Sequence, residues 1–251
     1  MAIVMAILGF AAIFSDFGVN SAFVQRRDVT AKQRTSLFWF NVFVSLGLML
    51  FVMAMSPWLA SFFRDDRLMF LIILSSTTFV ISALGLQVRM AVEKALFFRG
   101  VMLVEVISAL LGFVAAVWAA LTGWGVYSLI FGAIVSASSG TFLLWWFLSQ
   151  GWRPKLQFHL SEVRSFLGFG SALVANNVVN QINLTIDLIL GGRMLAAAQL
   201  GLYSIPRDLV LRVQGVVNPI VTRVAFPLIA EVQSNTDRVR RIYLQTLNSP
   251  L

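Results

Sequence analysis

The sequence has 251 residues, no cysteine and one histidine, and it carries a formal net charge of +8 at pH 7. Hydrophobic residues make up 59% of it and charged residues only 12%, against roughly 45–50% and about 25% in ordinary globular proteins. So little polar surface cannot cover a water-soluble particle of this size, and the composition therefore predicts a membrane protein. The missing cysteines exclude disulfides and thiolate metal sites, and one histidine excludes a His-based zinc-protease motif.

Apolar runs of membrane-spanning length follow one another along the whole chain. A transmembrane helix needs about 20 mostly apolar residues, and seven stretches meet this requirement. They are roughly Met1–Val24, Leu37–Phe63, Leu68–Val88, Phe97–Leu121, Gly125–Leu148, Phe166–Gly191 and Leu202–Ala230. The connections between them are too short to hold a soluble core. We therefore expect an all-α, polytopic membrane helix bundle of about seven transmembrane helices.

The basic residues alternate between the two sides of this predicted bundle. Thirteen follow the first, third, fifth and seventh stretches: Arg26, Arg27, Lys32, Arg34, Arg89, Lys94, Arg99, Arg153, Lys155, Arg164, Arg238, Arg240 and Arg241. The other side holds three, Arg64, Arg67 and Arg193. The positive-inside rule makes the richer side cytoplasmic and places Met1 on the outer side. The basic charge thus indicates a face attracted to anionic lipids, and we expect no nucleic-acid partner.

The sixth stretch carries a polar stripe. Asn176, Asn180, Asn183 and Asp187 are spaced i, i+4, i+7 and i+11, which puts them on one face of a helix. Such a face cannot be left against acyl chains. It either bonds to neighbouring helices or lines a wet lumen in which amides meet sugar hydroxyls. Because the stripe is three turns long, we favour the lumen and take these four residues as substrate-cavity candidates.

The seventh stretch combines arginines with prolines. Pro206, Pro219 and Pro227 are expected to kink or interrupt the helix, as happens at many transporter binding sites. Three arginines in the same stretch suit phosphate, because their forked donors match its oxygens. They are the remaining cavity candidates: Arg207, Arg212 and Arg223. The alternative is a structural ion pair between Asp208 and Arg212, with interfacial snorkelling of the other two.

Two carboxylates inside predicted spans are candidates for coupling to a proton or cation. Asp16 lies in the first stretch, and Glu105 lies in the fourth with Ser108 and Gly112 on the same face. For Glu105 a helix–helix hydrogen bond is the favoured reading, and for Asp16 both readings stand. Gly132, Ser136 and Gly140 form a small-residue ridge that predicts close helix packing. The sequence predicts no metal site and no cofactor.

Two segments resemble a known family. The first is Phe14–Asp28, continuing to Ser36–Trp39, and the second runs from Asn183–Asp187 through Leu200–Ser204 to Asn218–Pro227. Both resemble the bacterial polysaccharide and oligosaccharide flippases of the Wzx type, especially the colanic acid exporter branch. These belong to the superfamily that also holds the multidrug exporters.

The resemblance implies a fold of two six-helix lobes around a central cavity. Residues 1–150 would be the N-terminal lobe without its first helix, and residues 151–251 the start of a truncated C-terminal lobe. The chain would then be a fragment of a longer, multi-pass protein of the bacterial cell inner membrane.

The implied function is transport by alternating access, not enzymatic catalysis. The substrate would be an undecaprenyl-pyrophosphate-linked glycan unit for surface polysaccharide or lipopolysaccharide biosynthesis, with membrane lipids and a polysaccharide polymerase as further partners. Multidrug or metabolite export is an alternative, although it calls for an acidic, aromatic cavity. A glycan polymerase or ligase is a second alternative, but it needs convergent carboxylates or histidines and a large outer loop.

Overall fold

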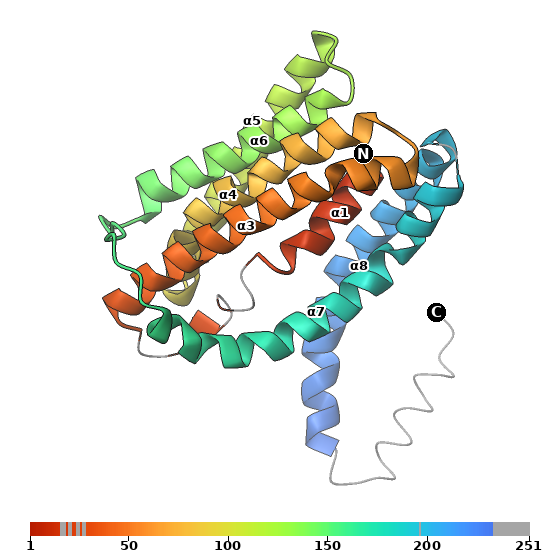
Figure 1. Cartoon of the computed structure of the whole chain (residues 1–251). Helices are drawn as coiled ribbons and strands as arrows, with labels where there is room; N and C mark the ends of the chain where they lie inside the picture. Colours follow the sequence, from red (N-terminus) through yellow and green to blue (C-terminus); the bar gives the residue numbers. More distant parts are fainter. Residues whose placement is uncertain (16–18, 20–21, 24–25, 27–28, 196, 233–251) are drawn as a thin grey trace. The chain divides into compact units, whose positions relative to one another are not determined.

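The computed structural model describes residues 1–15, 19, 22–23, 26, 29–195 and 197–232, with the backbone alone at 165, 167–173, 175, 197 and 216–232. Within these ranges the regular elements are all helices, which confirms the all-α prediction. In chain order they are α1 (Ala2–Ala12), α3 (Ala31–Phe63), α4 (Arg67–Lys94), α5 (Phe98–Leu121), α6 (Tyr127–Leu143), the π-helical turn η1 (Leu144–Leu148), α7 (Leu160–Met194) and α8 (Ala197–Val232) (Figure 1).

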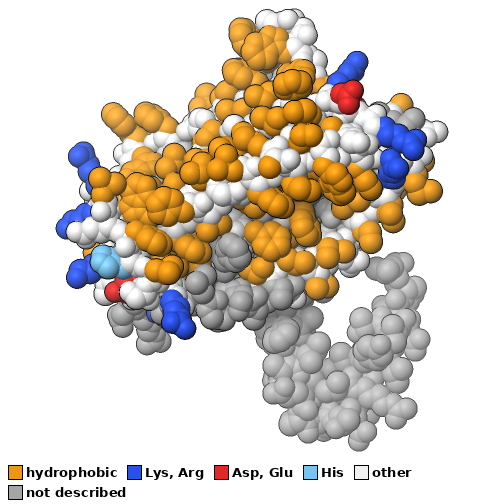
Figure 2. All heavy atoms as spheres, in the orientation of Figure 1, with side chains coloured by type: hydrophobic (Ala, Val, Ile, Leu, Met, Phe, Trp, Pro, Cys, Tyr) orange, Lys and Arg blue, Asp and Glu red, His pale blue; other side chains and the backbone are white. Residues whose placement is uncertain are grey.

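Four helical stretches are long and apolar enough to cross a membrane. They are α3, α4, α5 and the joined α6 and η1 (Tyr127–Leu148), and they confirm the second to fifth predicted spans. Large apolar side chains on them are exposed, for example Phe51, Phe113 and Trp146. Figure 2 shows such side chains as a broad hydrophobic surface with charged side chains toward its edges. Water does not stabilise an apolar surface of this extent, but the acyl chains of a bilayer do.

The first predicted span is not one helix. α1 ends at Ala12 after 11 residues, a length of about 16 Å, whereas the hydrocarbon core of a bilayer is about 30 Å thick. The chain turns at Ile13–Ser15, just where the polar residues Ser15 and Asp16 interrupt the apolar sequence. A continuous helix over Met1–Val24 is therefore wrong.

The last two predicted spans are helices, but they are less apolar than the other four. α7 has 35 residues and α8 has 36, so both are long enough to cross a bilayer. Neither is among the four, but parts of both helices (165, 167–173, 175, 197 and 216–232) lie outside the residues whose side chains the structure describes. About seven spans are therefore not confirmed.

α8 also differs from expectation at its prolines. It is one unbroken helix from Ala197 to Val232 and passes through Pro206, Pro219 and Pro227. Of the two expected effects, the interruption does not occur, and the kink stays a prediction. An interior proline removes one backbone hydrogen bond, but its fixed φ near −65° is itself helical, so the helix can continue beyond it.

Small residues bring α5 and α6 into close contact. A methyl group built on Gly112 would lie 2.6 Å from the Cβ of Ser136, and one built on Gly132 would lie 2.6 Å from the Cβ of Ala116. Only glycine permits this approach, because real Cβ atoms are not found so close. The small-residue ridge predicted on α6 is therefore confirmed as a helix-packing surface.

The N-terminal helices share a core to which α7 is attached. Val4 of α1, Val52 of α3, Ile72 of α4 and Ile130 of α6 are buried in one cluster, and α7 packs against α1 and α3. The chain forms two compact units, Met1–Leu195 and Ala196–Leu251, each described by itself. α7 thus belongs to the first unit, while the division into lobes after residue 150 stays a prediction.

Candidate functional site

One face of α7 is used to hold the helix in the first unit. Thr185 and Leu188 are buried on it, and Gly192 lies against Ile3 of α1 and Phe63 of α3. Gln181 also points to α1, since a Cβ on Gly9 would lie 3.0 Å from its Nε2 atom. At 100° per residue these positions fall within one sector of the helix, so this face is committed to packing.

The polar stripe predicted from the sequence lies on the opposite face of α7. Asn176, Asn180 and Asn183 are exposed, and Asp187 is half-buried. The helix is continuous through all four positions, so the expected i, i+4, i+7, i+11 alignment is present in the structure. The stripe therefore points away from α1 and α3 and does not serve to pack α7 against them.

The α8 arginines differ from one another in the second unit. Arg207 Nη1 lies 3.1 Å from Asp208 Oδ1, with the two side chains 14% and 55% exposed. The alternative interpretation, an ion pair between Asp208 and Arg212, is not what the structure shows, because the Asp208 carboxylate is paired with the neighbouring Arg207. Arg212 is exposed and has no ion pair among the described residues. Arg223 lies within α8, but its side chain is outside the described residues, as is all of Asp16.

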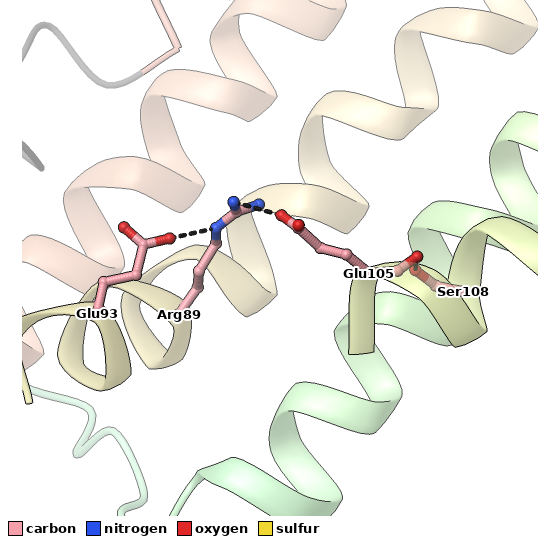
Figure 3. Close-up of polar contacts among 4 residues, drawn as sticks. All are labelled: Arg89, Glu93, Glu105 and Ser108. Atoms are coloured by element: carbon pink, nitrogen blue, oxygen red, sulfur yellow. Dashed lines mark hydrogen bonds and ion pairs between the residues drawn. The ribbon is translucent and has the colours of Figure 1, made fainter. Parts of the chain in front are cut away.

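Glu105 belongs to a charge cluster between α4 and α5 (Figure 3). Arg89 of α4 stands between two carboxylates: its Nε is 2.7 Å from Glu93 Oε1, and its Nη2 is 2.5 Å from Glu105 Oε1. The helix–helix interaction predicted for Glu105 is thus present, although its partner was not foreseen. The cluster carries one more negative than positive charge, and the Glu105 side chain is 52% exposed.

A pocket of about 240 Å³ opens beside this cluster. Arg89, Glu105, Ser108, Ser136 and Thr141 contribute to its lining from α4, α5 and α6. Sequence reasoning missed Arg89 because it counted this residue with the cytoplasmic connection. The sequence did contain a sign of this pair. Arg89 and Glu105 lie within a few turns of the same short connection between α4 and α5, so their side chains lie at a similar depth along the two helices.

A second pocket, of about 430 Å³, lies between α1, α3, α4 and α6. Its lining is mostly apolar but includes five hydroxyl groups, those of Ser15, Ser45, Ser75, Thr78 and Ser82. Thr78 donates its hydroxyl proton to the carbonyl of Ser75 at 2.7 Å, which keeps it compatible with the helix interior. The α7 stripe does not line this pocket, so the stripe and these hydroxyl groups are separate polar regions of the first unit.

The comparisons with known proteins agree on one family. Residues 1–249 match the family model described as polysaccharide biosynthesis protein. The chain is 30% identical over 235 residues to the teichuronic acid biosynthesis protein TuaB of Bacillus subtilis, covering 94% of this chain and 49% of TuaB. It is 29% identical over 244 residues to the lipopolysaccharide biosynthesis protein WzxC of Escherichia coli, covering 97% of this chain and 50% of WzxC.

A third relative is named as a transporter. The succinoglycan biosynthesis transport protein ExoT of Rhizobium meliloti is 24% identical over 241 residues, which cover 95% of this chain and 48% of ExoT. The chain therefore spans about half the length of these curated relatives. No solved structure matches it. With a family match over almost every residue and helices that can cross a bilayer, the chain is a membrane protein that belongs to the polysaccharide biosynthesis protein family.

Proposed function

We propose that the protein to which this chain belongs moves lipid-linked polysaccharide repeat units from the cytoplasmic to the outer leaflet of the bacterial inner membrane by alternating access. No covalent step is required. The barrier is the free-energy cost of taking a hydrated glycan and its phosphates through hydrocarbon, and a polar path through the protein lowers it. The family membership and the printed name of ExoT as a transport protein support this assignment.

The observation that carries the proposal is the amide stripe of α7. Asn176, Asn180 and Asn183 are exposed on a face that the packing against α1 and α3 leaves open. In a bilayer an amide without a partner is costly, whereas facing a wet cavity it donates to and accepts from sugar hydroxyls. Asp187, half-buried at the end of the stripe, supplies further acceptor oxygens.

Arginines of α8 supply the complementary charge for the lipid pyrophosphate. Of the three candidates, Arg212 fits the role best because it is exposed and has no ion pair among the residues that the structure describes. Arg207 already binds Asp208, so its charge is partly compensated. Arg223 remains a candidate on its sequence position alone.

The same proposal assigns Glu105 and Asp16 to coupling. Glu105 borders an open pocket and is paired with Arg89, so loss of its negative charge would break a contact between α4 and α5. A proton-linked conformational change needs this combination of a titratable group and a movable contact. We place Met1 on the outer side and the basic connections in the cytoplasm, with residues 1–150 and 151–251 in separate lobes.

The test is genetic and biochemical. Deleting the full-length gene should abolish the surface polysaccharide and trap lipid-linked repeat units, which remain inaccessible from the outer face of the membrane. The intact gene should restore both. Unchanged polysaccharide without a trapped intermediate contradicts the proposal, and accumulation of single, translocated repeat units identifies a polymerase instead.

A further inference from the structure

Arg34 lies in the first turn of α3, at the basic edge of the first unit. This turn is fixed by a reciprocal cap: the Thr30 hydroxyl accepts from the Gln33 amide at 3.2 Å, and the Thr30 amide donates to Gln33 Oε1 at 3.1 Å. α3 has 33 residues, a length of about 50 Å, while the hydrocarbon core measures about 30 Å. Its first turn can therefore reach the level of the lipid headgroups.

The Arg34 guanidinium is stacked but not neutralised. Its central carbon lies 4.0 Å from the centroid of the Trp152 ring. The Nε atom is buried and makes no hydrogen bond to any residue in the described part of the chain, where Arg34 also has no ion pair. A ring against the face of a guanidinium leaves its N–H groups directed outward in the guanidinium plane, where a forked acceptor can bind.

Trp152 is itself held firmly in place. It stacks on Trp145 with 5.8 Å between ring centroids and meets Phe38 edge-on at 6.0 Å. The following segment is attached to α3, because Trp39 Nε1 donates to the Lys155 carbonyl at 2.8 Å. Arg34 is thus positioned by a preorganised aromatic wall, which favours binding because little order has to be gained.

Beside Arg34 is a pocket of about 120 Å³, well above the roughly 10–15 Å³ that a cavity needs to hold one water molecule. Ser149 and Gln150 line it together with Arg34, and Phe97 forms an apolar side. The adjoining Leu96, Phe97 and Phe98 are exposed by 74%, 52% and 56%. A charged, polar recess thus lies directly beside apolar surface, as the headgroup and the acyl chains of one lipid require.

We propose that this pocket binds the phosphate group of an anionic membrane lipid, with Arg34 as the main ligand and Ser149 and Gln150 completing the site. The acyl chains of the lipid would cover Leu96–Phe98. This site is independent of the transport path proposed above, because none of the cavity candidates of α7 and α8 lines it.

The test uses the purified chain in a neutral detergent, titrated with phosphatidylglycerol and followed by native mass spectrometry. Diacylglycerol with the same acyl chains serves as the probe without phosphate. We expect phosphatidylglycerol to bind at least about fivefold more tightly than diacylglycerol, and Arg34→Gln to weaken its binding about tenfold. Lys32→Gln, in the same turn and exposed, removes an equal charge and should weaken binding by less than about twofold.

Three further results decide the matter. If Arg34→Gln does not give folded protein, Arg34→Lys keeps the charge but removes the forked donors, and it should still weaken phosphatidylglycerol binding. If excess sodium phosphate displaces the lipid from the wild-type chain, the oxyanion site stands but its ligand is free phosphate, which overturns the lipid assignment. Equal losses for Arg34→Gln and Lys32→Gln, or equal binding of the two lipids, would overturn the site altogether.

Discussion

Arg89 of α4 and Glu105 of α5 form an ion pair that joins two helices facing the lipid, with Nη2 and Oε1 2.5 Å apart (Figure 3). Because both side chains are more than a third exposed, screening limits the strength of the pair. We expect a double-mutant cycle with Arg89→Gln and Glu105→Gln to give a coupling free energy of about 0.5–1 kcal/mol. Thermal unfolding in detergent measures it.

Glu93→Gln is the matched control for that cycle, because it removes the other carboxylate at Arg89 but leaves the contact between α4 and α5. A cycle of Glu93→Gln with Glu105→Gln should show a smaller coupling, because these two residues interact only through Arg89. A zero coupling between Arg89 and Glu105 would show that the pair does not hold the two helices together.

The contact between α5 and α6 predicts opposite results for two glycine substitutions. Gly132→Ala places a methyl group 2.6 Å from the Cβ of Ala116 and 2.7 Å from the Gly112 carbonyl, so the helices must separate. We expect a loss of about 1–3 kcal/mol in the free energy of unfolding. Gly47→Ala meets no atom within 4 Å and should leave stability unchanged or raise it by up to about 1 kcal/mol. Similar thermal midpoints for both variants would contradict this packing.

Removing the amides of the α7 stripe should reduce transport without reducing the amount of protein in the membrane. Replacing Asn176, Asn180 and Asn183 together by leucine in the full-length protein should lower surface polysaccharide by at least about tenfold, since sugar hydroxyls lose their partners. Membrane abundance should not fall, because these side chains are exposed and do not pack against α1 or α3. Ile186→Leu, on the same helix, is the control. Normal polysaccharide in the triple variant would remove the stripe from the transport path.

Substitutions of Arg212 and Arg193 should have different effects, because we assign Arg212 to substrate binding and Arg193 to the stability of the fold. Arg212→Gln should lower transport at unchanged thermal stability, and Arg212→Lys should restore part of it because the charge is kept. Arg193 donates to the Phe62 carbonyl at 2.6 Å and lies over the Phe62 ring. Arg193→Gln should therefore lower the thermal midpoint. If Arg212→Gln instead lowers stability and Arg193→Gln lowers transport alone, the two roles are reversed.

Hydropathy predicted α3, α4, α5 and the joined α6 and η1 because each is a long run of apolar residues, a property of local sequence. It failed at α1, where a short apolar helix and the polar residues after Ala12 were merged into one span. At α8 the prolines indicated a kink or a break, and the helix shows no break. A proline in the sequence identifies the backbone hydrogen bond that is lost. Whether the helix continues beyond it depends on neighbouring groups in the folded protein, which the local sequence does not specify.

The polar residues were found one by one, but only some of their relations were foreseen. The alignment of Asn176, Asn180 and Asn183 follows from helix periodicity and could be predicted. The meeting of Arg34 with Trp152 could not, because these residues are far apart in the sequence and come together only through the packing of α3 with the segment after η1. The pairing of Asp208 with Arg207 and not with Arg212 could not be predicted either. The spacing of residues along a helix permits a contact but does not select among possible partners.

The central claim is that the amide face of α7 borders water within the membrane. The chain contains no cysteine, so each introduced cysteine is its single thiol, and thiols react with maleimides only where water lets them ionise. In the full-length protein, freed of any other cysteine, Asn180→Cys and Asn183→Cys should be labelled by a membrane-impermeant maleimide. Ile182→Cys and Ile189→Cys, at exposed apolar positions on another side of α7, should not. Equal labelling of all four, or of none, would contradict the claim.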